Sequence, residues 1–106
     1  MGVLTVTTAV DDFAVAGALS RSAVEARVAA CGQVSGPMTS TYWWDGKVEQ
    51  AQEWVVAFKT TAGRSQDLIA HLRREHPYHV PEIIVTPVVG GSPDYLAWVE
   101  AETTPR

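Results

Sequence analysis

Several features that mark particular classes of protein are scarce or missing in this sequence. Its 106 residues contain one cysteine, Cys31, so no disulfide can form within the chain, which is typical of a reducing compartment. No uninterrupted apolar run approaches the roughly 20 residues that cross a bilayer. The opening stretch MGVLTVTTAVDD has no basic segment ahead of its apolar residues, unlike a secretory signal. We therefore expect a cytoplasmic chain without a membrane span.

Basic charge is also scarce. The chain has 8 Lys and Arg against 12 Asp and Glu, for a formal net charge of -4. Binding to nucleic acid and docking on anionic lipid both depend on basic residues, so we expect neither partner. The aromatic RNP1 pattern of RNA-recognition modules is missing as well. Low-complexity segments and internal repeats are not found, and residues 1–106 are expected to form a single domain.

The short motifs of common catalytic sites are absent from the sequence. It contains no G-x-S-x-G, no H-E-x-x-H, no P-loop and no G-x-G-x-x-G, the patterns that carry nucleophiles, zinc, nucleoside phosphates and dinucleotides. We therefore predict a protein that is not an enzyme, and no organic cofactor is indicated.

What the chain does contain is an alternation of strand and helix patterns. Residues 3–8 are rich in β-branched side chains and predict a first strand. An Ala-rich segment with helical spacing predicts a helix from about residue 12 to residue 30 that stops near Gly32. Either Asp11 or Asp12 can cap its start.

The second half repeats the alternation. A helix is predicted over about 64–76, ended by Pro77. Residues 82–89 predict a buried strand, in which Pro87 marks an edge or a terminus. A short last helix begins around Pro93. With the two central strands described next, the order is β-α-β-β-α-β-α, which predicts an α+β ferredoxin-like fold.

The two central strands form a hairpin. Asp45-Gly46 is a strong signal for a two-residue type I′ turn, with strands over 39–44 and 47–61. If Trp44 pairs with Lys47, the two residue numbers of every pair in a regular hairpin add up to 91. That register predicts three further neighbours: Tyr42 with Glu49, Pro37 with Trp54, and Cys31 near Thr60. Because Gly36-Pro37 cannot continue a regular ladder, we expect a bend or bulge there.

The hairpin is longer than the core that could support it. From Met38 to Glu53 it forms an arm about 25 Å long, at roughly 3.3 Å per residue. A free two-stranded arm is marginally stable in water, and this one carries Tyr42, Trp43 and Trp44 near its tip. Tyr and Trp are enriched in the cores of subunit interfaces. We therefore predict that the arms of several copies pack together.

Metal-binding side chains are present but follow no established spacing. Cys31 is a possible soft-metal ligand, although free cysteines are commonly small buried apolar residues. His76, His79 and Glu82 offer two imidazoles and a carboxylate, groups that suit zinc or Cu(II). His76 at a helix C-terminus can equally be a capping residue. His71 is interpreted as a solvated helix residue.

A charged face runs along the long strand of the hairpin. Glu49 and Glu53 share that face with Lys59, near Tyr42 and Trp44. One reading is a solvated surface; the other is the wall of a cleft that binds a cation or a small polar ligand. A third possibility is a small-molecule enzyme in which Lys59 and Glu53 form an acid/base pair.

Five blocks of the sequence together resemble the CutA family of divalent-ion tolerance proteins. They are ARVAAC (26–31), STYWWDGKVEQAQE (40–53), FKTT (58–61), HPYHVPEIIVTPVVGG (76–91) and DYLAWV (94–99). They cover nearly the whole chain in order, and their combination is specific. The resemblance implies a subunit related to the PII signalling proteins, assembled as a homotrimer through the hairpins and linked to tolerance of copper and other divalent cations.

The resemblance also implies a set of site residues around a cleft between subunits. Its polar positions correspond here to Cys31, Tyr42, Trp44, Glu49, Glu53, Lys59, His76, Tyr78, Glu82 and Trp98. Two departures stand out. Some members carry further cysteines implicated in copper binding, whereas this chain has only Cys31. Position 79 is His here, which adds a further candidate ligand.

Overall fold

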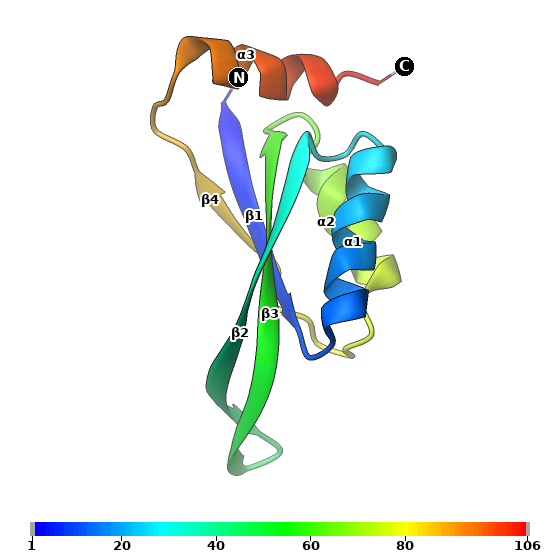
Figure 1. Ribbon diagram of the computed structural model, residues 1–106, viewed down its shortest axis with the longest axis vertical. Coiled ribbons are helices and arrows are strands. Elements are labelled where there is room, and N and C mark those ends of the chain that lie inside the picture. Colours follow the sequence, from blue (N-terminus) through cyan, green and yellow to red (C-terminus); the bar gives the residue numbers. More distant parts are fainter. Residues whose placement is uncertain (1, 106) are drawn as a thin grey trace.

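The fold follows the expected order of elements. The computed structural model describes residues 2–105, and its elements run β-α-β-β-α-β-α (Figure 1). Their bounds are β1 Val3–Val10, α1 Phe13–Glu25, β2 Cys31–Trp44, β3 Lys47–Thr61, α2 Ser65–Glu75, β4 Ile84–Pro87 and α3 Pro93–Glu102. The strands form one antiparallel sheet in the order β2-β3-β1-β4. This confirms the ferredoxin-like α+β class.

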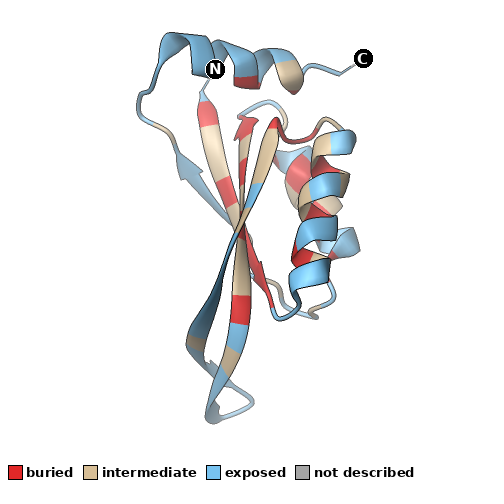
Figure 2. Ribbon diagram, in the orientation of Figure 1, coloured by how far each residue is buried: buried red, intermediate tan, exposed pale blue. Residues whose placement is uncertain are grey.

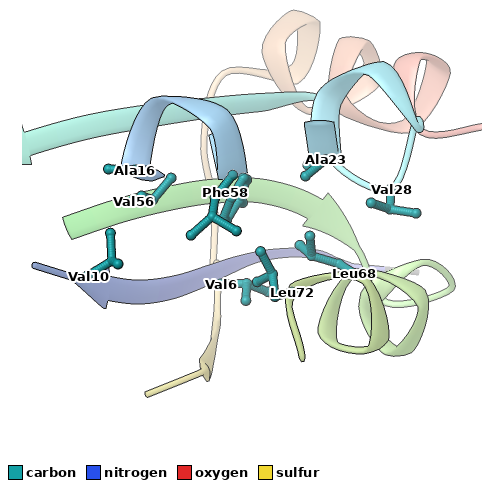
Figure 3. Packing of buried hydrophobic residues seen from close by; sticks show 11 residues of the cluster. Val6, Val10, Ala16, Ala23, Val28, Val56, Phe58, Leu68 and Leu72 are labelled. Carbon is teal, nitrogen blue, oxygen red and sulfur yellow. The ribbon is translucent and has the colours of Figure 1, made fainter. Parts of the chain in front are cut away.

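Helices α1 and α2 lie together on one face of the sheet and enclose the core (Figures 1 and 3). Val6 pairs with Phe58 across β1 and β3, and both are fully buried beneath Leu68 and Leu72 of α2. Each such side chain contributes roughly 1.5–3 kcal/mol to stability. The alternate residues of these strands point to the opposite face, along most of which no helix of residues 2–105 lies (Figure 1). We call it the open face; its residues include Thr5, Thr7, Val55, Ala57, Lys59 and Cys31.

Helix α1 ends earlier than its sequence pattern predicts, at Glu25 rather than near residue 30. Asp12, not Asp11, caps its start, because Asp12 Oδ1 accepts a hydrogen bond of 3.0 Å from the Val15 amide. At the other end the Arg27 and Val28 amides donate to the carbonyls of Val24 and Ala23, a Schellman motif.

Arg27 stands at the position in this motif that glycine usually occupies, with φ of 60°. Contacts far away in the sequence hold it there. Its Nη1 donates to the backbone oxygen and to Oε1 of Glu102, at 3.1 and 3.0 Å. Its own carbonyl accepts hydrogen bonds from the Arg64 guanidinium. Helical periodicity continues to residue 30, but these tertiary contacts end the helix.

The hairpin turn agrees with the prediction. Asp45 and Gly46 both have positive φ, 51° and 75°. The pairs from Trp44–Lys47 to Met38–Glu53 keep the predicted register, including Tyr42 opposite Glu49. The arm extends beyond the rest of the subunit (Figure 1).

The register changes between Ser35 and Met38, where the bend was expected. Two residues of β2, Gly36 and Pro37, oppose one residue of β3, so Pro37 does not pair with Trp54. Beyond the bulge Cys31 therefore pairs with Lys59 rather than lying near Thr60. A shift of one residue moves a side chain to the other face of a sheet, and it places Cys31 on the open face.

Strand β4 is not the buried strand that its apolar sequence predicts. It covers Ile84–Pro87 and all four residues are exposed (Figure 2). The reason is its place at the edge of the sheet, where it pairs only with β1. The edge position indicated by Pro87 is confirmed. Among residues 2–105, no helix is long and apolar enough to cross a membrane.

Candidate functional site

A carboxylate and a phenol meet at the foot of the arm. The Tyr78 hydroxyl donates a hydrogen bond of 2.8 Å to Oε2 of Glu53. Trp54 is the last residue of β3, toward the arm, that pairs with β1, and Glu53 is its neighbour on the arm side. The exposed fraction of Glu53 is 8%. Tyr78 lies in the segment that follows α2. β1 ends at Val10, opposite Trp54, so Glu53 has no β1 residue beside it.

The surroundings of Tyr78 keep its phenol neutral. Burial, the hydrogen bond to Glu53 and the charge of that carboxylate raise the pKa of Tyr78 above its ordinary value, with smaller contributions from Asp11 and Tyr42. Asp11 was considered from the sequence only as a helix cap. The signal that could have found it is the Asp11-Asp12 pair itself, because one carboxylate is enough to cap the helix.

His76 is buried, and both of its ring nitrogens have backbone partners. Nε2 lies 2.9 Å from the carbonyl oxygen of Ala9, and Nδ1 accepts a hydrogen bond of 3.1 Å from the Tyr78 amide. A metal ion would have to displace one of these partners. In this conformation His76 therefore offers no nitrogen to a metal. It is the C-cap residue of α2, which fits the second of the two readings from the sequence.

A second group of candidate residues lies at the other end of the open face. The Cys31 sulfur and the Tyr95 hydroxyl oxygen are 3.5 Å apart, and the Tyr95 ring lies 5.6 Å from that of Trp98. Lys59 pairs with Cys31 across the strands, and its Nζ donates to Oε1 of Gln33 at 3.3 Å. The hydrogen bond with Cys31, together with burial, raises the pKa of Tyr95 to about 12. By sequence alone Tyr95 is one of the apolar residues of a short helix, and nothing in the pattern marks it as a partner of Cys31.

The other candidates are exposed. Tyr42, Trp44 and Glu49 lie on the arm, and His79 and Glu82 lie between α2 and β4. Within residues 2–105 no three His, Cys, Asp or Glu side chains come close enough to hold one metal ion. His71 is not simply solvated: its Nε2 lies 2.9 Å from the Ser22 hydroxyl and links α2 to α1.

The two groups of candidate residues are well separated within one chain. Glu53 and Lys59 are six residues apart on β3, which corresponds to about 20 Å at roughly 3.3 Å per residue. A single small ligand cannot contact both. The structure therefore brings together Glu53 with Tyr78, and Cys31 with Lys59. Trp98 joins the second set only through Tyr95, and the two sets stay apart.

These features define a class of protein: a ferredoxin-like α+β subunit with a projecting aromatic hairpin and polar groups at both ends of an open sheet face. The family described as CutA1 divalent ion tolerance protein matches residues 4–102, and the chain belongs to this family, as its sequence blocks indicated. The Divalent-cation tolerance protein CutA of Pectobacterium atrosepticum is 44% identical over 94 residues, which are 89% of this chain and 84% of that protein.

Solved structures agree with this assignment. CutA from Xylella fastidiosa matches with a TM-score of 0.95 at 36% identity, covering 98% of this chain and all (100%) of that chain. CutA1 from Oryza sativa matches with a TM-score of 0.94 at 31% identity, covering 98% of this chain and 95% of that chain. The fold and its length are thus common to bacterial and plant members.

Proposed function

We propose that this chain is the subunit of a cytoplasmic homotrimer that serves divalent-cation tolerance. In this proposal each cleft between subunits binds a divalent cation, copper or zinc, or a small polar ligand. The observation that carries it is the arm from Met38 to Glu53, which projects from the subunit with its aromatic side chains uncovered. Trp43 at its tip is 75% exposed.

The distribution of exposed apolar side chains supports assembly. Most of the large ones lie on the arm or in and beside β4: Met38, Tyr42, Trp43, Trp44, Val48, Val80, Ile84, Val85 and Val89. The others, Phe13, Tyr95 and Trp98, lie on α1 and α3. Exposed apolar side chains concentrated on one part of a subunit are typical of interfaces. The sheet also ends in two unpaired edges, β2 and β4. Pairing one edge with the other edge of a neighbour, head to tail, closes a ring and removes both edges.

The separation of the two groups of polar residues supports a site formed between subunits. Cys31 and Lys59 lie toward one end of the sheet and Glu53 with Tyr78 toward the other, about 20 Å apart along β3. A head-to-tail arrangement can bring one end of a subunit toward the opposite end of its neighbour. A ligand that contacts both groups then requires residues from two chains.

The donor types favour a cation. A thiol, a carboxylate and an imidazole suit zinc or Cu(II). Cys31, Glu82 and His79 provide them on exposed or partly exposed surface, and Glu53 adds a buried carboxylate at the foot of the arm. His76 is omitted because both of its nitrogens have partners. The family's name, divalent ion tolerance, points to the same class of ligand.

The alternative, an enzyme with Lys59 and Glu53 as acid and base, has no support from the geometry of one chain. Direct proton transfer requires groups within hydrogen-bond reach of a common substrate. These two side chains stand about 20 Å apart along β3.

Light scattering and calorimetry test the proposal. We expect a mass near three times the 11.5 kDa of one chain, and heat of binding when Cu(II) or Zn(II) is added. Cys31→Ser and Glu82→Gln should weaken binding. His71→Ala should not, because His71 lies in α2 and contacts α1. A folded species with the mass of one chain would contradict the trimer. Equal isotherms for the wild type and both ligand variants would remove these metals from the site.

A further inference from the structure

We propose that His76 is a positioning residue: it fixes Tyr78 so that the phenol holds the Glu53 carboxylate, and it is not itself a ligand. This inference rests on the proposed function only in taking Glu53 as a ligand-facing group. Three observations carry it: the partners of the two ring nitrogens of His76, the contact of its ring with Tyr78, and the hydrogen bond from Tyr78 to Glu53.

The partners of His76 determine its tautomer. A backbone carbonyl can only accept a hydrogen bond, so the contact of 2.9 Å with Ala9 requires a proton on Nε2. A backbone amide can only donate, so the contact of 3.1 Å with Tyr78 requires a lone pair on Nδ1. The ring is therefore neutral and carries its proton on Nε2, and both nitrogens are engaged at once.

The ring also touches the side chain that it positions. The His76 and Tyr78 rings meet edge to face, with centroids 4.8 Å apart and planes at 65°. His76 is 7% exposed, so its own orientation is held by packing. Nδ1 thus fixes the backbone of Tyr78 while the ring face or edge fixes its side chain.

The end of this chain of contacts is the carboxylate. Tyr78 donates to Oε2 of Glu53 at 2.8 Å, and among residues 2–105 no side chain or amide donates to Oε1. One carboxylate oxygen is thereby held in place, and Oε1 is the atom that the proposal assigns to a ligand. Ala9 belongs to strand β1. Its carbonyl holds His76, His76 holds Tyr78, and Tyr78 holds the Glu53 carboxylate, so the position of the carboxylate is fixed relative to the sheet. Residues that orient ligand-binding groups in this way typically contribute 10–100-fold to metal affinity.

Nitrogen NMR of the wild-type protein tests the tautomer of His76 without any substitution. We expect Nε2 of His76 to give the signal of a protonated ring nitrogen and Nδ1 that of an unprotonated one at neutral pH. The opposite tautomer, or a charged ring, would overturn the proposal. Added Zn(II) should leave both His76 signals unchanged; broadening or a large shift of Nδ1 would make His76 a ligand and would also overturn it.

Substitutions test the second step through a signal that mere loss of stability does not move. The ring carbon that bears the hydroxyl is labelled in all tyrosines, and the Tyr78 resonance is assigned with Tyr78→Phe. His76→Ala should shift this resonance in the direction seen for Glu53→Gln. His76→Asn, whose amide oxygen can replace Nδ1 as acceptor for the Tyr78 amide, should restore at least half of the wild-type position. His71→Ala is the matched control, since it removes a histidine with one hydrogen bond elsewhere. An unchanged resonance in His76→Ala would refute positioning.

Metal affinity separates this inference from the proposed function. Where the wild type binds Zn(II), His76→Ala should weaken binding about 10-fold and His76→Asn by less. Equal affinity in His76→Ala and the wild type would overturn the proposal. If the wild type binds no metal, the proposed function fails, and the tautomer and the Tyr78 resonance still decide the role of His76. If His76→Ala does not fold, His76→Asn and the wild-type spectra decide it.

Discussion

Replacing Tyr78 with Phe removes one hydroxyl and leaves the ring and its contact with His76 in place. The lost hydrogen bond is 2.8 Å long and ends on a carboxylate whose residue is 8% exposed. Hydrogen bonds to charged groups contribute about 1.5–3 kcal/mol. Because Tyr78 is only partly buried, we expect the lower end of this range. The free energy of unfolding of Tyr78→Phe should fall by about 1.5 kcal/mol, roughly tenfold in the equilibrium constant.

Urea unfolding at neutral pH, at one fixed protein concentration, measures this change, since assembly makes stability depend on concentration. A double-mutant cycle with Glu53→Ala isolates the pair. A coupling energy close to zero would show that the hydroxyl does not stabilise the carboxylate, and it would refute the reasoning.

The pH dependence of the same variant follows from the raised pKa of Tyr78. A phenol whose pKa is higher in the folded than in the unfolded protein contributes stability that is fully present below about pH 10, the ordinary value for tyrosine. This stability is lost as the pH rises above that value. The difference in stability between wild type and Tyr78→Phe should therefore be constant from neutral pH to about pH 9 and should narrow at higher pH. If the stability difference between wild type and Tyr78→Phe instead grew above pH 9, the raised pKa of Tyr78 would not be its cause.

Three further predictions concern other parts of the fold. Gly36 has φ of +134°, and an added Cβ would lie 3.0 Å from the Glu53 carbonyl oxygen, so Gly36→Ala should destabilise by about 1–3 kcal/mol in urea unfolding. Gly17→Ala is the control: this glycine lies in a helix with open space around it, so the substitution should stabilise the protein by about 0.5–1 kcal/mol. Equal changes in the free energy of unfolding for the two variants would exclude backbone strain at the bulge. Cys31→Ala should lower the pKa of Tyr95 from about 12 toward its ordinary value, which ultraviolet titration of the tyrosines reads directly, and should reduce the stability that Tyr95 contributes below about pH 10. Asp12→Ala should cost about 1 kcal/mol through loss of the helix cap, whereas Asp11→Ala should cost clearly less; the reverse order in thermal unfolding would reassign the cap.

Local chemistry accounts for the parts of the fold that could be predicted from the sequence. The turn at Asp45-Gly46 depends on the backbone freedom of the two residues themselves. The break at Gly36-Pro37 follows from a proline that cannot donate to a ladder. Apolar periodicity was enough for α2: it predicts Leu68, Ile69 and Leu72 on the inward side, and Leu68 and Leu72 are fully buried while Ile69 is half-buried. From such elements the order of strands and helices, and with it the ferredoxin-like class, could be derived.

The sequence pattern was insufficient where a contact from a distant segment competes with it. Helix α1 stops where Arg27 is held by Glu102, 75 residues further along the chain. Strand β4 is apolar but exposed, because its burial depends on its place at the sheet edge and not on its composition. At the bulge two residues of β2 lie opposite one residue of β3, and this extra residue decides which face Cys31 occupies. Counting pairs from the turn alone does not reveal the extra residue.

The sequence alone determined which kinds of side chain the site could draw on: Glu53, Tyr78, His76 and Cys31 were all named from it. Tertiary structure decided what each one does. His76 resembled a metal ligand by residue type, yet the carbonyl of Ala9, 67 positions away, takes one nitrogen and makes it a support for Tyr78. A side chain's donors and acceptors are written in the sequence, but whether they remain available depends on which backbone groups folding brings within about 3 Å of them.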